Sequence, residues 1–100
     1  MSTSPTPLSV ERSLRRLGEH IATWRKLQGL QTAELANRAG IARSTLQSIE
    51  AGRGGTNIEN ILRVLRALGI MEKVVEGADP YTTDVGKLRA DEVLPQRVRR

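Results

Sequence analysis

The chain has 100 residues and no cysteine, so a single domain is expected, and a disulfide framework and a thiolate metal site are both excluded. No apolar run approaches the ~20 residues that span a bilayer, and the opening MSTSPTPLS lacks the basic and apolar regions of a secretory signal, so we expect a cytoplasmic protein without membrane contact. Arg supplies thirteen of the sixteen positive charges, against eleven negative ones, and Arg suits phosphate and guanine, although a GC-rich genome would also enrich it.

The first predicted element is a helix over residues 10–28. Residues 1–8 are rich in Pro, Ser and Thr and are interpreted as a disordered leader, after which Ser9 is expected to cap the helix. Gly29 would end it. The apolar residues repeat at helical intervals and define the face that should enter the core: Val10, Leu14, Leu17, Ile21 and Trp24.

Two short helices follow, over about residues 32–38 and 43–51. Leu46 and Ile49 form the apolar pair of the second helix, and Gly40 stands in the turn between the two helices. Short helices joined by a Gly-containing turn have the spacing of a helix-turn-helix. Many small helical domains contain such a pair, so the spacing alone leaves both interpretations open.

A fourth helix is predicted over residues 58–68, with Thr56 or Asn57 as its cap, and a fifth over residues 70–76. No segment alternates apolar and polar residues over enough positions to indicate a strand, so the predicted fold class is all-α. The apolar stripe expected to enter the core from the fourth helix consists of Ile58, Ile61, Leu62, Leu65 and Leu68.

These elements divide the chain into the leader, a five-helix domain over residues 9–76, and a C-terminal extension over residues 77–100. In the extension, Thr83 or Asp84 would cap a short helix that runs through Ala90. The basic end, LPQRVRR, is too short to fold alone. We interpret the extension as a basic tail that attracts phosphate or as a contact surface for a dimer or another protein.

Residues 21–69 resemble the phage-repressor type of helix-turn-helix domain, the Cro/C1 or XRE family. This resemblance implies a five-helix, phage-repressor-like domain that binds double-stranded DNA as a homodimer. It is carried by Ile21, Arg25, Gly29-Leu30, Glu34-Leu35-Ala36, Ala39-Gly40-Ile41, Ser44-Thr45-Leu46, Ile49-Glu50, Gly52 and Ala67-Leu68-Gly69.

The resemblance also implies which residues meet DNA. The helix from Arg43 would lie in the major groove, where Arg suits guanine and Gln suits adenine or a phosphate. The residues expected to face the bases are Ala42, Arg43, Ser44, Gln47 and Ser48. The residues expected near phosphates are Gln31, Thr32, Arg38, Thr45 and Arg53.

The resemblance further implies a structural ion pair between Arg25 and Glu50. Two positions depart from the family pattern. The second helix opens with Gln31-Thr32 where Ser-Gln is usual, so Thr32 would take over the cap or the phosphate contact. Ala42 stands where a Ser or Thr usually caps the recognition helix, and its methyl group would be free to touch a thymine methyl.

The function that these observations favour is a sequence-specific transcriptional regulator, acting as a repressor on a palindromic operator. The alternative is an antitoxin-type protein, similar to HipB-like regulators, which binds a partner toxin through its C-terminal region and regulates its own operon. An enzyme is not expected, because the sequence shows no nucleophile–base pair. No metal or other cofactor is expected either, since His20 is the only histidine and no cysteine accompanies it. The two aromatic residues are too few for a protein that stacks the bases of single strands.

Overall fold

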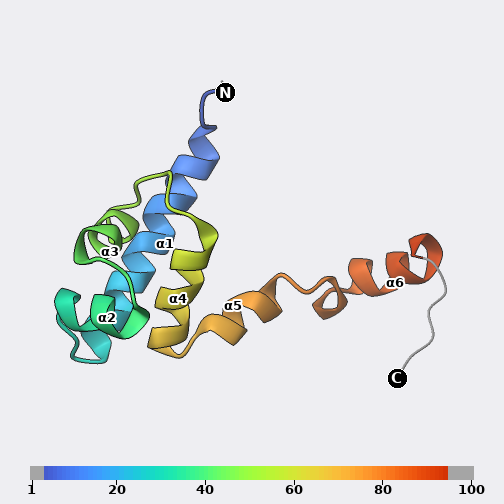
Figure 1. The fold of residues 1–100 in the computed structure, drawn as a ribbon. Coiled ribbons are helices and arrows are strands. Elements are labelled where there is room, and N and C mark those ends of the chain that lie inside the picture. The colour runs from blue at the N-terminus through green and yellow to red at the C-terminus, as the bar shows by residue number, and fades with distance from the viewer. Residues whose placement is uncertain (1–3, 95–100) are drawn as a thin grey trace.

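Six α-helices and one 3₁₀ turn form the secondary structure of residues 4–94, the part of the chain that this computed structural model describes (Figure 1). No strand occurs in that part, and the all-α prediction is confirmed. The elements are α1 (Leu8–Leu27), α2 (Thr32–Ala39), α3 (Arg43–Glu50), α4 (Ile58–Leu68), α5 (Met71–Gly77), the 3₁₀ turn η1 (Pro80–Thr82) and α6 (Asp84–Val93).

Helix α1 begins two residues earlier than its sequence indicated. The prediction that Ser9 caps it is wrong, because Pro7 occupies the N-cap position and Leu8 is already helical. The carbonyl of Pro7 accepts hydrogen bonds from the backbone N–H groups of Val10 and Glu11, at 3.0 and 3.1 Å. Proline is tolerated at a helix start because the amide hydrogen that it lacks is not needed there.

The core lies where α1, α2, α3 and α4 meet, since α1 packs against α3 and α4 while α2 packs against the same two helices. Its largest fully buried side chains come from all four helices: Ile21, Leu35, Leu46, Leu65 and Val64. Burying each such aliphatic side chain contributes about 1.5–3 kcal/mol. The core is therefore shared among four helices and fixes their mutual orientation.

Four side chains depart from the predicted core. Val64 is fully buried although it was not placed in the apolar stripe of α4, whereas Ile58, which was, is 74% exposed. Ile58 is the first residue of α4, and the inward face of that helix is formed instead by Ile61, Val64 and Leu65. Trp24 and Val10 were expected in the core but are 36% and 46% exposed, so both lie at the edge of the bundle.

Helix α1 and the end of α3 approach so closely that only glycine fits between them. A Cβ atom at Gly18 would lie 2.5 Å from the carbonyl oxygen of Ile49 and 2.6 Å from that of Glu50. Gly52 has a φ of +76°, and a Cβ atom there would lie 2.6 Å from the Cα of Arg15. Glycine costs a helix interior about 0.5–1 kcal/mol relative to alanine, and at Gly18 that cost is offset by backbone contact that holds α3 in place.

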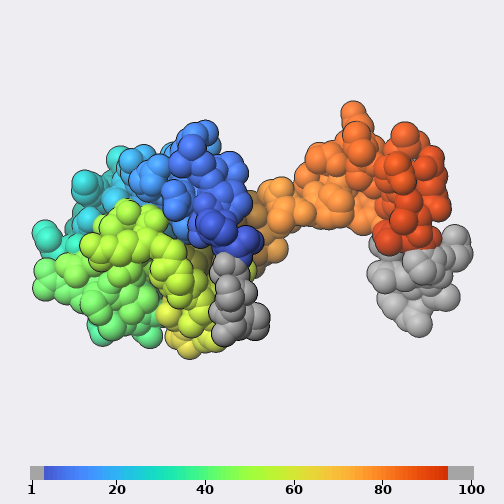
Figure 2. Space-filling model, turned by 90° about the horizontal axis from the view of Figure 1, so that it is seen from above, coloured from blue at the N-terminus to red at the C-terminus, as the bar shows by residue number. Residues whose placement is uncertain are grey.

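The C-terminal part of the described chain extends away from this bundle. Helix α5 packs on α4, whereas α6 makes its main contact with η1, and in Figures 1 and 2 this segment stands apart from the body of the molecule. The Cα radius of gyration is 16.9 Å, above the ~13 Å of a compact chain of this length. The helix predicted to end at Ala90 continues to Val93, and Thr83 is its cap. Among the described residues, no helix has both the length and the apolarity that a membrane span requires.

Candidate nucleic-acid interface

Helices α2 and α3 form a helix-turn-helix through a three-residue connection. Gly40 ends α2 in the left-handed conformation, with a φ of +73°, which glycine adopts without a steric penalty. The next backbone N–H, of Ile41, donates to the carbonyl of Ala36 at 3.0 Å. This hydrogen bond reverses the chain and brings the buried Ala36 and Ala39 of α2 against α3.

The resulting orientation of α3 separates an inner from an outer face. Leu46 and Ile49, the apolar pair of the sequence analysis, are 0% and 4% exposed and therefore face the core. The five residues predicted to face bases lie at the N-cap of α3 or on its accessible side: Ala42, Arg43, Ser44 and Gln47 are exposed and Ser48 is half-buried. The outer face therefore offers short polar side chains and one guanidinium to a ligand.

A bidentate ion pair fixes the C-terminal end of this helix. Arg25 Nε lies 2.8 Å from Glu50 Oε2, and Arg25 Nη2 lies 3.1 Å from Oε1. Arg25 Nη1 also donates to the carbonyl of Leu30 at 3.0 Å. Both charged side chains are 13% exposed. The hydrogen bond to Glu50, together with its negative charge, raises the pKa of Arg25 against the opposing effect of burial. The pair thus joins α1, the turn after it and the end of α3.

Three of the residues predicted near phosphates or bases come together in a polar hollow between α3 and the start of α4. Thr45, Ser48 and Arg53 line it. Three further polar residues in its wall, which the sequence analysis missed, are Thr56, Asn57 and Asn60. Asn57 is the N-cap of α4, and its Oδ1 accepts from the backbone N–H of Asn60 at 2.8 Å. Hydroxyl, amide and guanidinium groups beside a helix N-terminus suit an anionic phosphate.

The other residues predicted near phosphates lie outside this hollow, on α2. Gln31 is the N-cap of α2 and Thr32 is already its first residue, so of the two roles predicted for Thr32 the cap is wrong and the phosphate contact stays a prediction. The backbone N–H of Gln31 donates to Glu34 Oε1 at 2.8 Å, and this contact satisfies an amide at the start of the helix. Gln31 and Arg38 are exposed at opposite ends of α2. The predicted phosphate contacts therefore fall into two groups, one on α2 and one in the hollow between α3 and the start of α4.

Ala42 occupies the N-cap of α3 and provides no side-chain hydrogen bond to that helix. We expect Ala42→Ser to raise the free energy of unfolding by about 1 kcal/mol, because the hydroxyl would accept from a free amide of the first turn. The measurement is urea denaturation followed by circular dichroism. Ala42→Val is the matched control, since valine also lacks the hydroxyl group and is as poor an N-cap residue as alanine. If the serine variant is no more stable than the valine variant, the expected capping by a hydroxyl group at this position is contradicted.

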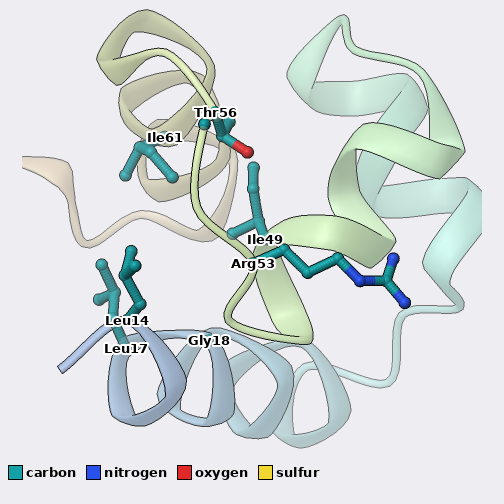
Figure 3. A pocket seen from close by; sticks show the side chains of 8 residues that line it. Leu14, Leu17, Gly18, Ile49, Arg53, Thr56 and Ile61 are labelled. Carbon is teal, nitrogen blue, oxygen red and sulfur yellow. The ribbon is translucent and has the colours of Figure 1, made fainter. Parts of the chain in front are cut away.

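A second hollow is apolar and adjoins the polar one, with which it shares Arg53, Gly55 and Thr56. Its volume is about 110 Å³. It is lined by Leu14, Leu17, Gly18, Ile49, Arg53, Gly55, Thr56 and Ile61. Figure 3 shows the guanidinium of Arg53 directed away from the aliphatic side chains, so the interior is hydrocarbon. Within residues 4–94, no group of three His, Asp or Glu side chains is arranged to bind a metal.

Comparison with known proteins gave one match. A family model described as helix-turn-helix matches residues 21–71, which include α2, α3, α4 and the second part of α1. No curated protein and no solved structure matches the chain. The match leaves the first half of α1 and everything from residue 72 onward, including nearly all of α5, outside the shared domain.

Proposed function

The chain belongs to the Cro/C1-type (XRE) family of helix-turn-helix DNA-binding transcriptional regulators, and we propose that it is a repressor that binds a palindromic operator as a homodimer. The recognition helix would be α3, with Arg43 donating to guanine and Gln47 to adenine or a phosphate. Repression would follow from occupation of a promoter by the dimer.

One observation carries the proposal. The outer face of α3 is accessible and polar. The helix itself is held in place by the buried side chain of Leu46, by backbone contact with Gly18 and by the Arg25–Glu50 ion pair. A helix that reads bases must present its side chains at a fixed angle, because a displacement of about 1 Å breaks bidentate geometry. The rigid support and the polar surface therefore fit a reading helix better than a solvated one.

Charge supports the same function. Residues 4–70 contain ten basic and five acidic residues, and Arg38 and Arg53 are exposed on either side of α3. Basic residues that neutralise phosphates release counterions, which makes the binding dependent on salt. In a homodimer, two recognition helices about 34–36 Å apart would enter successive major grooves on one side of the duplex.

The test is the affinity of the full chain for an enriched duplex, measured by fluorescence anisotropy over a series of salt concentrations. Two arginine–phosphate contacts in each protomer predict a slope of log affinity against log salt of about −4. A single-stranded oligonucleotide of the same sequence is the control and should bind more weakly. Equal affinity for the single strand and the duplex, or a slope near zero, would contradict the proposal.

A second candidate function is that of an antitoxin-type protein whose C-terminal segment holds a partner protein. The observation that favours it is the segment after α5, which stands apart and exposes Tyr81, Val85 and Leu88. Purification of the untagged chain together with the product of the neighbouring reading frame tests this function. A stoichiometric complex that dissociates when Leu88 is replaced by Asp would support it, and its absence would contradict it.

A further inference from the structure

Residues 79–94, called here the arm, form a small unit held together by local hydrogen bonds. Asp79 Oδ1 accepts from the backbone N–H of Tyr81 at 2.9 Å, and Thr83 Oγ1 accepts from that of Gly86 at 2.9 Å. Thr83 Oγ1 also donates to the carbonyl of Pro80 at 2.8 Å. Gly86 touches the same carbonyl so closely that no Cβ atom would fit. The turn and the helix α6 are thus fixed to each other.

This ordered unit nevertheless buries none of its side chains. Tyr81, Val85 and Leu88 are 48%, 71% and 65% exposed. Val85 and Leu88 are three residues apart in α6 and so lie on one helical face. Helices shorter than about 12–15 residues are marginal in water without tertiary contacts, and α6 has ten. An arm of this kind gains stability when its apolar face packs against another surface.

The first half of α1 provides an apolar surface of matching character. Val10 and Leu14 are four residues apart and so lie on one face of α1; Val10 is 46% exposed, and Leu14 lines the apolar hollow of Figure 3. The hollow, at about 110 Å³, approaches the ~150 Å³ of a cavity that accepts a benzene ring. An aliphatic side chain such as that of Leu88 is of suitable size to enter it.

The two surfaces are also complementary in charge. The arm contains four acidic residues and two basic ones. The first half of α1 presents exposed Arg12, Arg15 and Arg16, with Glu11 and Glu19 as its acidic residues. Opposite charges around an apolar contact favour the correct pairing and disfavour contact between like surfaces. Both segments lie outside the matched domain of residues 21–71, so each is an addition to the shared fold.

We propose that the arm of one copy packs on the first half of α1 of a second copy, with Leu88 entering the apolar hollow, and that the second arm makes the reciprocal contact. The second copy is the occupant because the arm stands apart from its own bundle (Figures 1 and 2) and carries the charge opposite to that of the α1 surface. A two-fold axis then generates two identical contacts, as in an isologous dimer. The proposal rests on the homodimer of the proposed function and assigns the surfaces that form it.

Cross-linking between introduced cysteines tests the contact directly, because the chain has no cysteine of its own. One preparation carries Val85→Cys in the arm, and a second, with a different tag, carries Val10→Cys in α1. On mixing with a short bismaleimide, a cross-linked dimer that contains both tags is expected. Asn37→Cys replaces Val10→Cys in the control, since Asn37 is exposed on α2, and that mixture should give only background.

Two results of this experiment overturn the proposal. One is a mixed cross-link no more abundant than that of the control. The other is a chain carrying both Val85→Cys and Val10→Cys that cross-links within itself at high dilution, because the arm would then fold onto its own bundle.

Sedimentation equilibrium of full-length variants separates this proposal from the proposed function. Leu88→Asp should shift the protein from the dimer mass to the 11.0 kDa of one chain, whereas Lys87→Ala, on another side of α6, should leave the dimer intact. If Leu88→Asp remains dimeric and still binds operator DNA, the arm contact is overturned while the proposed repressor stands. If the wild-type protein is a dimer and Leu88→Asp dissociates it as expected, but the wild-type dimer binds no duplex, the proposed function fails and the arm contact stands.

Discussion

Replacing Glu50 with Ala will lower the melting temperature of the protein by more than about 10 °C. Removal of one partner from a buried ion pair costs about 3–5 kcal/mol, and 1 kcal/mol corresponds to about 4–8 °C in a domain of this size. Arg25 would lose both carboxylate contacts, at 2.8 and 3.1 Å, and keep only the carbonyl of Leu30. The Arg25 side chain, which is only 13% exposed in the wild-type protein, would then lack a counter-charge. Thermal denaturation followed by circular dichroism measures the effect.

The matched control for this prediction is Glu59→Ala. Glu59 pairs with Arg63 one helical turn away in α4, at 3.0 Å, with side chains that are 72% and 48% exposed respectively. Surface pairs of this kind contribute about 0.3–0.5 kcal/mol, so the melting temperature should fall by only a few degrees. Similar decreases for the two variants would show that the Arg25–Glu50 pair does not hold α3 in place.

Replacing Arg43 with Ala will relax the base preference at one position of each operator half-site. Arg43 is the first residue of α3 and is exposed, so its guanidinium is free to form two hydrogen bonds with guanine O6 and N7. One such bidentate contact provides about 1–3 kcal/mol of discrimination, which corresponds to about 5- to 150-fold between the preferred base and another. Selection of bound duplexes by the wild type and by Arg43→Ala, followed by sequencing, measures the change.

Arg38→Ala removes the same charge from an exposed position of α2 and serves as the control. Because a phosphate contact carries no sequence information, this variant should bind all sequences more weakly and keep the wild-type base preferences. Its salt dependence should be shallower by about two units for the two copies in the dimer. If Arg43→Ala kept every base preference of the wild type, the assignment of Arg43 as a residue that contacts bases would be contradicted.

Periodicity predicted α1 to α4 well because each of these helices has an inner face that enters the core. The apolar residues of α1 and the Leu46–Ile49 pair repeat at helical intervals, and glycine marks most of the ends. Errors arose at helix ends and bundle edges. Ile58 matches the stripe of α4 but stands at its first turn, beyond the neighbouring helices, whereas Val64 lies inside. Burial there depends on which helices are adjacent, and the sequence of one helix does not contain that information.

Contacts between segments that are far apart in the sequence could not be predicted from helical periodicity either. Gly18 packs against the carbonyls of Ile49 and Glu50, and the available signal was a glycine on the inward side of a helix, where it indicates close backbone approach. Thr56, Asn57 and Asn60 join Thr45 in one hollow because the loop after α3 folds back. The sequence marked Thr56 and Asn57 only as candidate helix caps, and it did not mark Asn60. The Arg25–Glu50 pair was expected only through the family resemblance, because nothing in the spacing of 25 residues implies contact.

Selection of bound duplexes from a random pool by the wild-type full chain, at two salt concentrations, tests the central claim most directly. We expect enrichment of an inverted repeat whose half-sites are centred about 10 base pairs apart. A guanine preference in each half-site should be lost with Arg43→Ala, and total binding should fall at the higher salt concentration while the preferred sequence stays the same. A pool that remains random at both salt concentrations would contradict the assignment of α3 as a helix that reads DNA.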